Sequence, residues 1–324
     1  MNDRKRTPIT LAIYRDLRVG MVIITLMLGV AILIEQLSAT CWQFAISAYY
    51  YTSAHSIMIA ALLALGTLLI MYKGSSDTED VSLTLAGVSA LMIAMVPQGR
   101  PTNLCGRNDL PPQFEPAIEP NVWAVVVALI VGWLAMTVLH WRNHTRHKRS
   151  LLGTLGLWIF WPIMALGFIA LVFFPGWFNA HVHGIAGFLL LASFIITVFC
   201  AAYVVGREDI VKSPHRDRYK WWYRVIAWAM VGTLIAVVAL HLRHPGWELW
   251  VLLMEGLVII EFALYWAVQT VELWDSPDRK ERLPDDVQRW IEEERTAGGG
   301  FARMRSELSE RHDDRQGGRL LPLL

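Results

Sequence analysis

Long apolar stretches without charged residues alternate with short polar segments along the 324-residue chain. A helix needs roughly 20 mostly apolar residues to cross the hydrocarbon core of a bilayer. Eight stretches approach or reach that length, and the pattern therefore predicts eight transmembrane helices. They run approximately over residues 19–34, 56–72, 81–96, 122–141, 151–174, 184–205, 223–242 and 247–271. Seven spans are the alternative, in which the first stretch lies in the membrane interface.

The composition indicates the same class of protein. Apolar residues make up 55% of the chain and charged residues 18%, compared with roughly 45–50% and about 25% in soluble domains. The expected fold class is all-α, a polytopic membrane helix bundle over residues 1–271. Residues 272–324 predict a small cytoplasmic tail, in which PDDVQRWIEEER forms a short amphipathic helix. The net charge of +1 argues against a nucleic-acid partner, whereas the apolar spans imply membrane lipid as a partner.

Positive charge falls almost entirely on one side of the predicted bundle. All but three of the 29 Lys and Arg residues lie in the terminal segments or in connections on that side; the exceptions are Arg100, Arg107 and Arg243. Because Lys and Arg concentrate on the cytoplasmic side of membrane proteins, both termini are expected in the cytoplasm. Arg15 and Arg18 interrupt the start of the first apolar stretch, where we expect their long side chains to reach out to the membrane interface.

Two of the three cysteines, Cys41 and Cys105, fall in segments predicted on the opposite, outer side. Thiols on that side meet oxidising conditions, so a Cys41–Cys105 disulfide is expected. It would join the first outer segment to the second, which carries six prolines between residues 97 and 120. Two unrelated free thiols are the alternative, because spacing in the sequence does not determine disulfide geometry.

Half of the ten histidines gather at the outer ends of different spans: His55, His181, His183, His241 and His244. Bundles build metal and proton-relay sites from imidazole groups on separate helices. His55, His183 and His241 are therefore candidate ligands of a divalent metal such as zinc. The chain has neither an H-E-x-x-H nor a CxxC motif, and histidines that hydrogen-bond at the membrane interface are the alternative.

Two carboxylates, Glu255 and Glu261, lie inside the last predicted span. A carboxylate in hydrocarbon is costly and usually faces the bundle interior. Short turns join the fifth span to the sixth and the seventh to the eighth, so we expect His183, His241 and Glu255 to converge in one outer cavity. A structural hydrogen bond is the alternative for each glutamate. The acidic run 77–80 before the third span predicts a helix N-cap, with a functional acidic pair as the alternative.

Four segments carry a resemblance to other proteins: SAYYYT (47–52), ALLALGTLLIMYKG (61–74), DTED (77–80) and LTLAGVSALMIAMVP (83–97). Together they resemble an uncharacterised family of polytopic membrane proteins of high-GC bacteria. The resemblance covers roughly residues 38–97, less than a fifth of the chain. It implies a bacterial inner membrane and carries no activity with it.

A fainter likeness is to the transmembrane hydrolases that include alkaline ceramidases and adiponectin receptors. Their zinc site uses Ser-x-x-x-His, an Asp on the next span and His-x-x-x-His on a late span. Here Ser53-Ala-His55 and His181-Val-His183 have other spacings, and the third span has no internal Asp. The likeness implies zinc-dependent hydrolysis, and these departures count against it.

Three functions agree with the sequence, and whether the protein is an enzyme is left open. The first is the binding or movement of a lipid or small solute through an outer cavity lined by His55, His181, His183, His241, Glu255 and Glu261. The second is a membrane-embedded, metal-dependent lipid hydrolase, in which a bound metal would activate water. The third is a structural or assembly subunit without chemistry.

Overall fold

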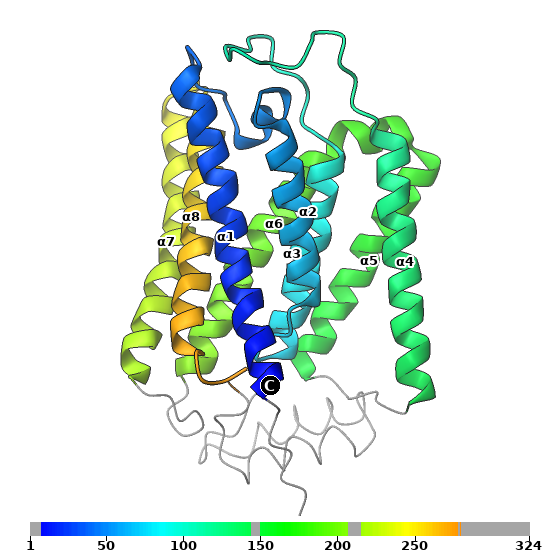
Figure 1. The fold of residues 1–324 in the computed structure, drawn as a ribbon, viewed down its shortest axis with the longest axis vertical. Coiled ribbons are helices and arrows are strands. Elements are labelled where there is room, and N and C mark those ends of the chain that lie inside the picture. Colours follow the sequence, from blue (N-terminus) through cyan, green and yellow to red (C-terminus); the bar gives the residue numbers. More distant parts are fainter. Residues whose placement is uncertain (1–7, 144–149, 207–214, 278, 280–324) are drawn as a thin grey trace, which may run out of the picture.

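The computed structural model describes residues 8–143, 150–206, 215–277 and 279, and these residues fold into an all-helical bundle (Figure 1). The tail helix predicted in PDDVQRWIEEER lies outside the described residues. The described helices are α1 (Pro8–Ser38), the 3₁₀-helix η1 (Ile46–Tyr51), α2 (His55–Met71), α3 (Asp77–Met95), α4 (Ile118–Arg142), α5 (Leu151–Phe173), α6 (Pro175–Gly206), α7 (Arg216–Arg243) and α8 (Trp250–Glu272).

Each of the eight apolar stretches forms an α-helix, which confirms the predicted fold class. Seven of these helices are long and apolar enough to cross a membrane, and the protein is therefore a multi-pass membrane protein. The remaining helix, α2, has 17 residues. At 1.5 Å per residue it is about 26 Å long, slightly less than the hydrocarbon core of about 30 Å.

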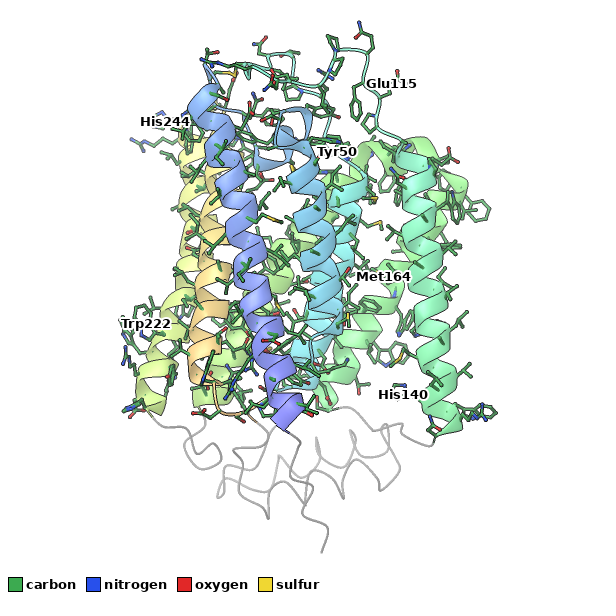
Figure 2. All side chains as sticks on the ribbon, in the orientation of Figure 1. Tyr50, Glu115, His140, Met164, Trp222 and His244 are labelled. Atoms are coloured by element: carbon green, nitrogen blue, oxygen red, sulfur yellow. A yellow bond between two sulfur atoms is a disulfide. The ribbon has the colours of Figure 1, made fainter. Side chains whose placement is uncertain are left out.

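The helices run side by side, and their connections gather at two ends of the bundle (Figure 1). The end at which α1 begins and α8 ends is called the tail end. The opposite end, called the loop end, carries η1 and the long connection between α3 and α4. Figure 2 shows His140 and Trp222 at the tail end, and Tyr50, Glu115 and His244 at the loop end. This division matches the alternation of sides that the sequence predicts.

The central helix of the bundle is α3, which packs against α2, α5 and α6. The largest buried apolar cluster joins α1, α2, α3, α6, α7 and α8. In contrast, only 6% of the most apolar stretch of α4 is buried, and the same share holds for α5. Most of the surface of these two helices therefore faces away from the bundle.

A close contact between α2 and α3 depends on two glycines. A Cβ on Gly66 would lie 2.8 Å from the carbonyl oxygen of Gly87. A Cβ on Gly87 would lie 2.5 Å from the carbonyl oxygen of Gly66 and 2.6 Å from Ile70 Cγ1. Small residues let membrane helices approach closely enough to gain van der Waals contact. The two glycines therefore determine how near α3 can lie to α2.

The Gly87→Ala variant is expected to unfold at a lower temperature than the wild type, because the added methyl group meets the backbone of α2. Overpacking of this kind costs about 1–3 kcal/mol. The control is Gly232→Ala in α7, where a Cβ would meet no heavy atom within 4 Å. Thermal unfolding of both purified variants in detergent measures the difference, and equal midpoints would contradict the close contact.

Candidate functional site

Glu255 binds the backbone of the segment that leads into η1. Its Oε2 accepts a hydrogen bond of 2.7 Å from the backbone N–H of Ile46. Close by, the N–H of Leu252 donates to the carbonyl oxygen of Phe44 at 3.0 Å. The carboxylate thus caps the start of η1 and fixes this segment to α8, as the structural alternative for this residue describes.

His55 and His183 each use Nδ1 to bind a backbone carbonyl. His55 Nδ1 lies 2.6 Å from the carbonyl oxygen of Tyr50, and its ring packs edge-on against Tyr50 and Phe114. His183 Nδ1 lies 2.6 Å from the carbonyl oxygen of Val96, just after α3. Both imidazoles therefore hold a chain segment in place.

The other predicted site residues lie in separate places on α6, α7 and α8. His181 stacks on Trp177 at a ring distance of 4.8 Å, and His241 stacks on Trp250 at 4.4 Å. Glu261 Oε1 accepts a hydrogen bond of 2.8 Å from the Thr233 hydroxyl. None of these contacts joins two of the predicted site residues. His241 Nδ1 and Glu261 Oε2 are buried without a hydrogen-bond partner among the described residues.

The described residues contain no group of three His, Cys, Asp or Glu side chains that could hold a metal ion. His183, His241 and Glu255, which we expected to converge, instead contact the Val96 carbonyl, the Trp250 ring and the Ile46 amide. The contacts found for these three side chains are thus local and do not link one of them to another.

The expected disulfide is present between Cys41 and Cys105, with a Cα–Cα distance of 5.8 Å. Next to it, the N–H of Thr40 donates to the carbonyl oxygen of Cys105 at 3.0 Å. The bridge fastens the end of α1 to the proline-rich connection between α3 and α4.

A buried polar network at the tail end is the strongest candidate site, and sequence reasoning missed most of it. Its members come from α1, α7, α8, the segment after α8 and the ends of α2 and α3, and each is at most 4% exposed. We call them the tail-end network: Arg18, Tyr72, Glu79, Tyr223, Tyr265, Trp266, Gln269, Glu272 and Arg279.

The first part of the network is an ion pair between Arg279 and Glu272. Arg279 Nη2 lies 2.7 Å from Glu272 Oε2, and Arg279 Nε lies 3.2 Å from Oε1. The Tyr223 hydroxyl donates to Glu272 at 2.5 Å and accepts from Arg279 at 2.9 Å. Arg279 also donates to Ser75 Oγ. Both charged groups thus have hydrogen bonds beyond their mutual pairing, as a buried ion pair requires.

The second part of the network centres on Arg18, which is fully buried rather than reaching to the interface. Its Nε donates to the Tyr72 hydroxyl at 3.0 Å, and its Nη1 donates to the carbonyl oxygen of Leu273 at 2.9 Å. It also donates to the carbonyl oxygen of Pro277. The expected interfacial position is therefore wrong, because the chain after α8 folds back over Arg18 and replaces water as its partner.

The third part of the network is Glu79, within the acidic run predicted to cap the third span. Ser76 is the N-cap of α3 and accepts from the backbone N–H of Glu79 at 3.2 Å. The Glu79 carboxylate accepts hydrogen bonds from the backbone N–H of Ser75 at 2.9 Å and from the Tyr265 hydroxyl at 3.0 Å. The acidic run therefore both starts the helix and sends one carboxylate into the bundle.

Two side chains of the network have polar atoms without hydrogen-bond partners among the described residues: Trp266 Nε1 and both ends of the Gln269 amide. Both side chains are 0% exposed. Tyr265, Gln269 and Glu272 are spaced by four and three residues, so they share one face of α8. The unpartnered amide thus lies on the face that carries the hydrogen bonds to Glu79 and Arg279.

Removing one partner of the Arg279–Glu272 pair is expected to destabilise the fold by about 3–5 kcal/mol, because the other charge stays buried. Arg279→Met tests this expectation by unfolding in detergent. The double variant Glu272→Gln, Arg279→Met should recover part of the loss. Asp275→Asn is the matched control, since Asp275 is 88% exposed in its pair with Arg15. Equal losses of stability from Arg279→Met and Asp275→Asn would show that the buried pair contributes no more to stability than the exposed pair.

No protein-family model, curated protein or solved structure matches the chain. The role of the tail-end network must therefore come from its own chemistry. That chemistry combines two arginines, two glutamates, three tyrosines, an indole N–H and a primary amide within membrane helices and the segments that adjoin them.

Proposed function

We propose that this protein binds a small, uncharged polar solute at the tail-end network and moves it across the membrane. The observation that carries the proposal is the pair of buried side chains Gln269 and Trp266, whose polar atoms have no partner among the described residues. An unpaired buried polar group costs about 1–3 kcal/mol. A ligand with its own donor and acceptor would remove this cost.

The charges around these two side chains favour an uncharged solute. The formal charges of Arg18 and Arg279 balance those of Glu79 and Glu272, and all four groups are engaged in hydrogen bonds within the protein. What remains is an amide that can donate and accept and an indole N–H that can donate. These groups suit a hydroxyl, a carbonyl or another amide.

Residues 273–277, together with Arg279, close the site toward the tail end. Arg18 holds the carbonyl groups of Leu273 and Pro277, and Arg279 holds Glu272. Gln269 has no exposed surface in this arrangement, so a solute enters or leaves only after the arrangement opens. In our proposal residues 273–277 form a gate, which opens when Arg18 releases their carbonyl groups.

We further propose that the tail end faces the cytoplasm of a bacterial cell and that membrane lipid covers the outward surfaces of α4 and α5. The asymmetry of Lys and Arg supports this orientation. The resemblance of residues 38–97 to membrane proteins of high-GC bacteria supports an inner membrane. The low burial of the two apolar helices supports contact with lipid.

Solute movement is tested in proteoliposomes with glycerol and urea as probes, followed by stopped-flow light scattering. Wild-type protein is expected to speed the passage of at least one probe over protein-free vesicles. Gln269→Leu should slow it roughly tenfold, the effect of losing about 1.4 kcal/mol of hydrogen bonding. Trp266→Phe should slow it as well, because it removes the N–H and keeps the ring.

Gln113→Leu is the matched control, since Gln113 lies exposed in the connection between α3 and α4. It should behave as wild type. The network only holds the bundle together if two results are found. Gln269→Leu would be more stable than the wild type, and vesicles with wild-type protein would be no more permeable than empty ones. The third hypothesis from the sequence would then stand.

The orientation is tested by cysteine labelling in intact cells on a Cys200→Ala background. Glu115→Cys lies at the loop end and Asn143→Cys follows α4 at the tail end, and both positions are exposed. A membrane-impermeant maleimide should label position 115 in intact cells and position 143 only after lysis. The reverse pattern would invert the proposed orientation.

A further inference from the structure

The loop end contains a second pair of carboxylates, the buried Glu35 and the half-buried Asp109, which the sequence did not single out. Glu35 lies in the last turn of α1, and Asp109 lies in the connection between α3 and α4. The Cys41–Cys105 disulfide brings these two segments together. A Cβ on Gly106 would collide with Glu35 Oε1 and would lie 2.5 Å from Asp109 Oδ1. The two carboxylate oxygens thus flank a single point and lie within a few ångströms of each other.

Each carboxylate has one oxygen bound and one oxygen without a partner. Glu35 Oε2 accepts from the Ser53 hydroxyl, and Asp109 Oδ2 accepts from the backbone N–H of Gly106 at 3.0 Å. Glu35 Oε1 and Asp109 Oδ1 are buried and have no hydrogen-bond partner in the described part of the chain. The Glu35 side chain is only 1% exposed. Two buried acceptors that face one point require a positive partner.

No charged or titratable group of the described residues, Arg107 included, hydrogen-bonds to these two oxygens. The Arg100 guanidinium donates to the carbonyl oxygens of Leu110 and Pro111, and the Tyr49 hydroxyl donates to Gln36. The pKa of Asp109 is raised by burial and also by the charge of Glu35, while the Gly106 N–H and Arg100 oppose this shift. The carboxylates thus repel each other within the protein when both are ionised.

We propose that Glu35 and Asp109 bind one divalent cation of the calcium type at the loop end. The available donors are hard carboxylate oxygens, which Ca²⁺ prefers, whereas zinc sites usually include Cys or His ligands. An open depression of about 420 Å³, lined by residues that include Arg100, Gly106, Arg107 and Asp109, adjoins the Asp109 side of this pair. Water entering from this depression completes the coordination shell, since Ca²⁺ takes six to eight oxygen ligands.

The site has few charged ligands, and its affinity is therefore low. Calcium sites of extracellular modules bind at about 0.1–1 mM, and this site belongs in that range. The bound cation joins the end of α1 to the proline-rich connection, beside the disulfide that joins the same two segments. The cation and the disulfide thus restrain the loop end together.

The experiment uses the full-length chain with its disulfide intact, stripped with a chelator and then titrated with CaCl₂ by calorimetry. One Ca²⁺ per chain is expected to bind at about 0.1–1 mM, with a rise in the thermal unfolding midpoint. Asp109→Asn should abolish both effects. Glu35→Gln should do the same, and Asp109→Asn keeps the test valid if Glu35→Gln fails to fold, because Asp109 lies in a half-buried loop position. Glu115→Gln is the control on the same connection and should bind as wild type.

A shared proton is the competing explanation, and it predicts a different result. A raised pKa of Asp109 means that stability is present at acidic pH and is lost as the pH rises through the folded-state pKa. Two results together would overturn the cation site. The wild-type protein would bind no Ca²⁺ at several times the expected dissociation constant, and its stability at the loop end would fall with rising pH unless Asp109 is changed to Asn. Binding that survives in Asp109→Asn would overturn it as well.

Discussion

The ion pair between Arg279 and Glu272 is the contact on which the tail end of the bundle depends. Taking two charges out of water costs several kcal/mol for each ion, and their attraction offsets this cost only when further hydrogen bonds satisfy the remaining groups. Tyr223 and Ser75 provide those bonds. Because Arg279 follows α8 by seven residues, the pair requires the chain to turn back beneath the bundle. That turn brings the carbonyl groups of residues 273–277 over Arg18.

The loop end is stabilised by different means. Here a disulfide fixes the connections, and polar side chains bind their backbone amide and carbonyl groups. Glu255 binds an amide of the η1 segment, and His183 binds the carbonyl of Val96. Irregular backbone within or next to a membrane needs such partners, because hydrocarbon offers none. This requirement explains why polar residues at the ends of the spans work individually rather than as one cluster.

The two proposed binding sites share one physical feature and differ in their chemistry. At each end, polar atoms are buried without a partner in the described part of the chain, which is uncommon in native proteins. At the tail end the unpartnered groups are an amide and an indole N–H amid balanced charges, which suits an uncharged solute. At the loop end they are two carboxylate oxygens without a compensating cation, which suits a metal ion. The sites lie at opposite ends of the bundle and are independent of each other.

The local pattern of the sequence was sufficient to predict the number and approximate extent of the helices and the fold class. It also predicted that successive connections lie at alternate ends of the bundle. These properties follow from hydrophobicity over about 20 residues, which does not depend on what packs against each helix. The start of α3 at the acidic run was also predictable, because acids favour the first turn of a helix. The N-cap itself is Ser76, which precedes the run 77–80 that was expected to cap the helix. The disulfide was predictable as one of two alternatives, from the side on which each cysteine falls.

Only the tertiary structure determined which polar residues meet. Arg18 binds carbonyl groups some 255 residues away, and Glu79 binds a tyrosine 186 residues away. In the sequence, Arg18 resembles an ordinary interfacial cation and Glu79 an ordinary capping acid, since each lies near the end of an apolar stretch. In the sequence, the histidines gathered at one end resemble a single binding site. In the structure, the rotation of each helix directs them to separate partners. A pattern along one helix gives the depth of a side chain in the membrane, whereas its partner depends on the rotation and neighbours of every helix around it.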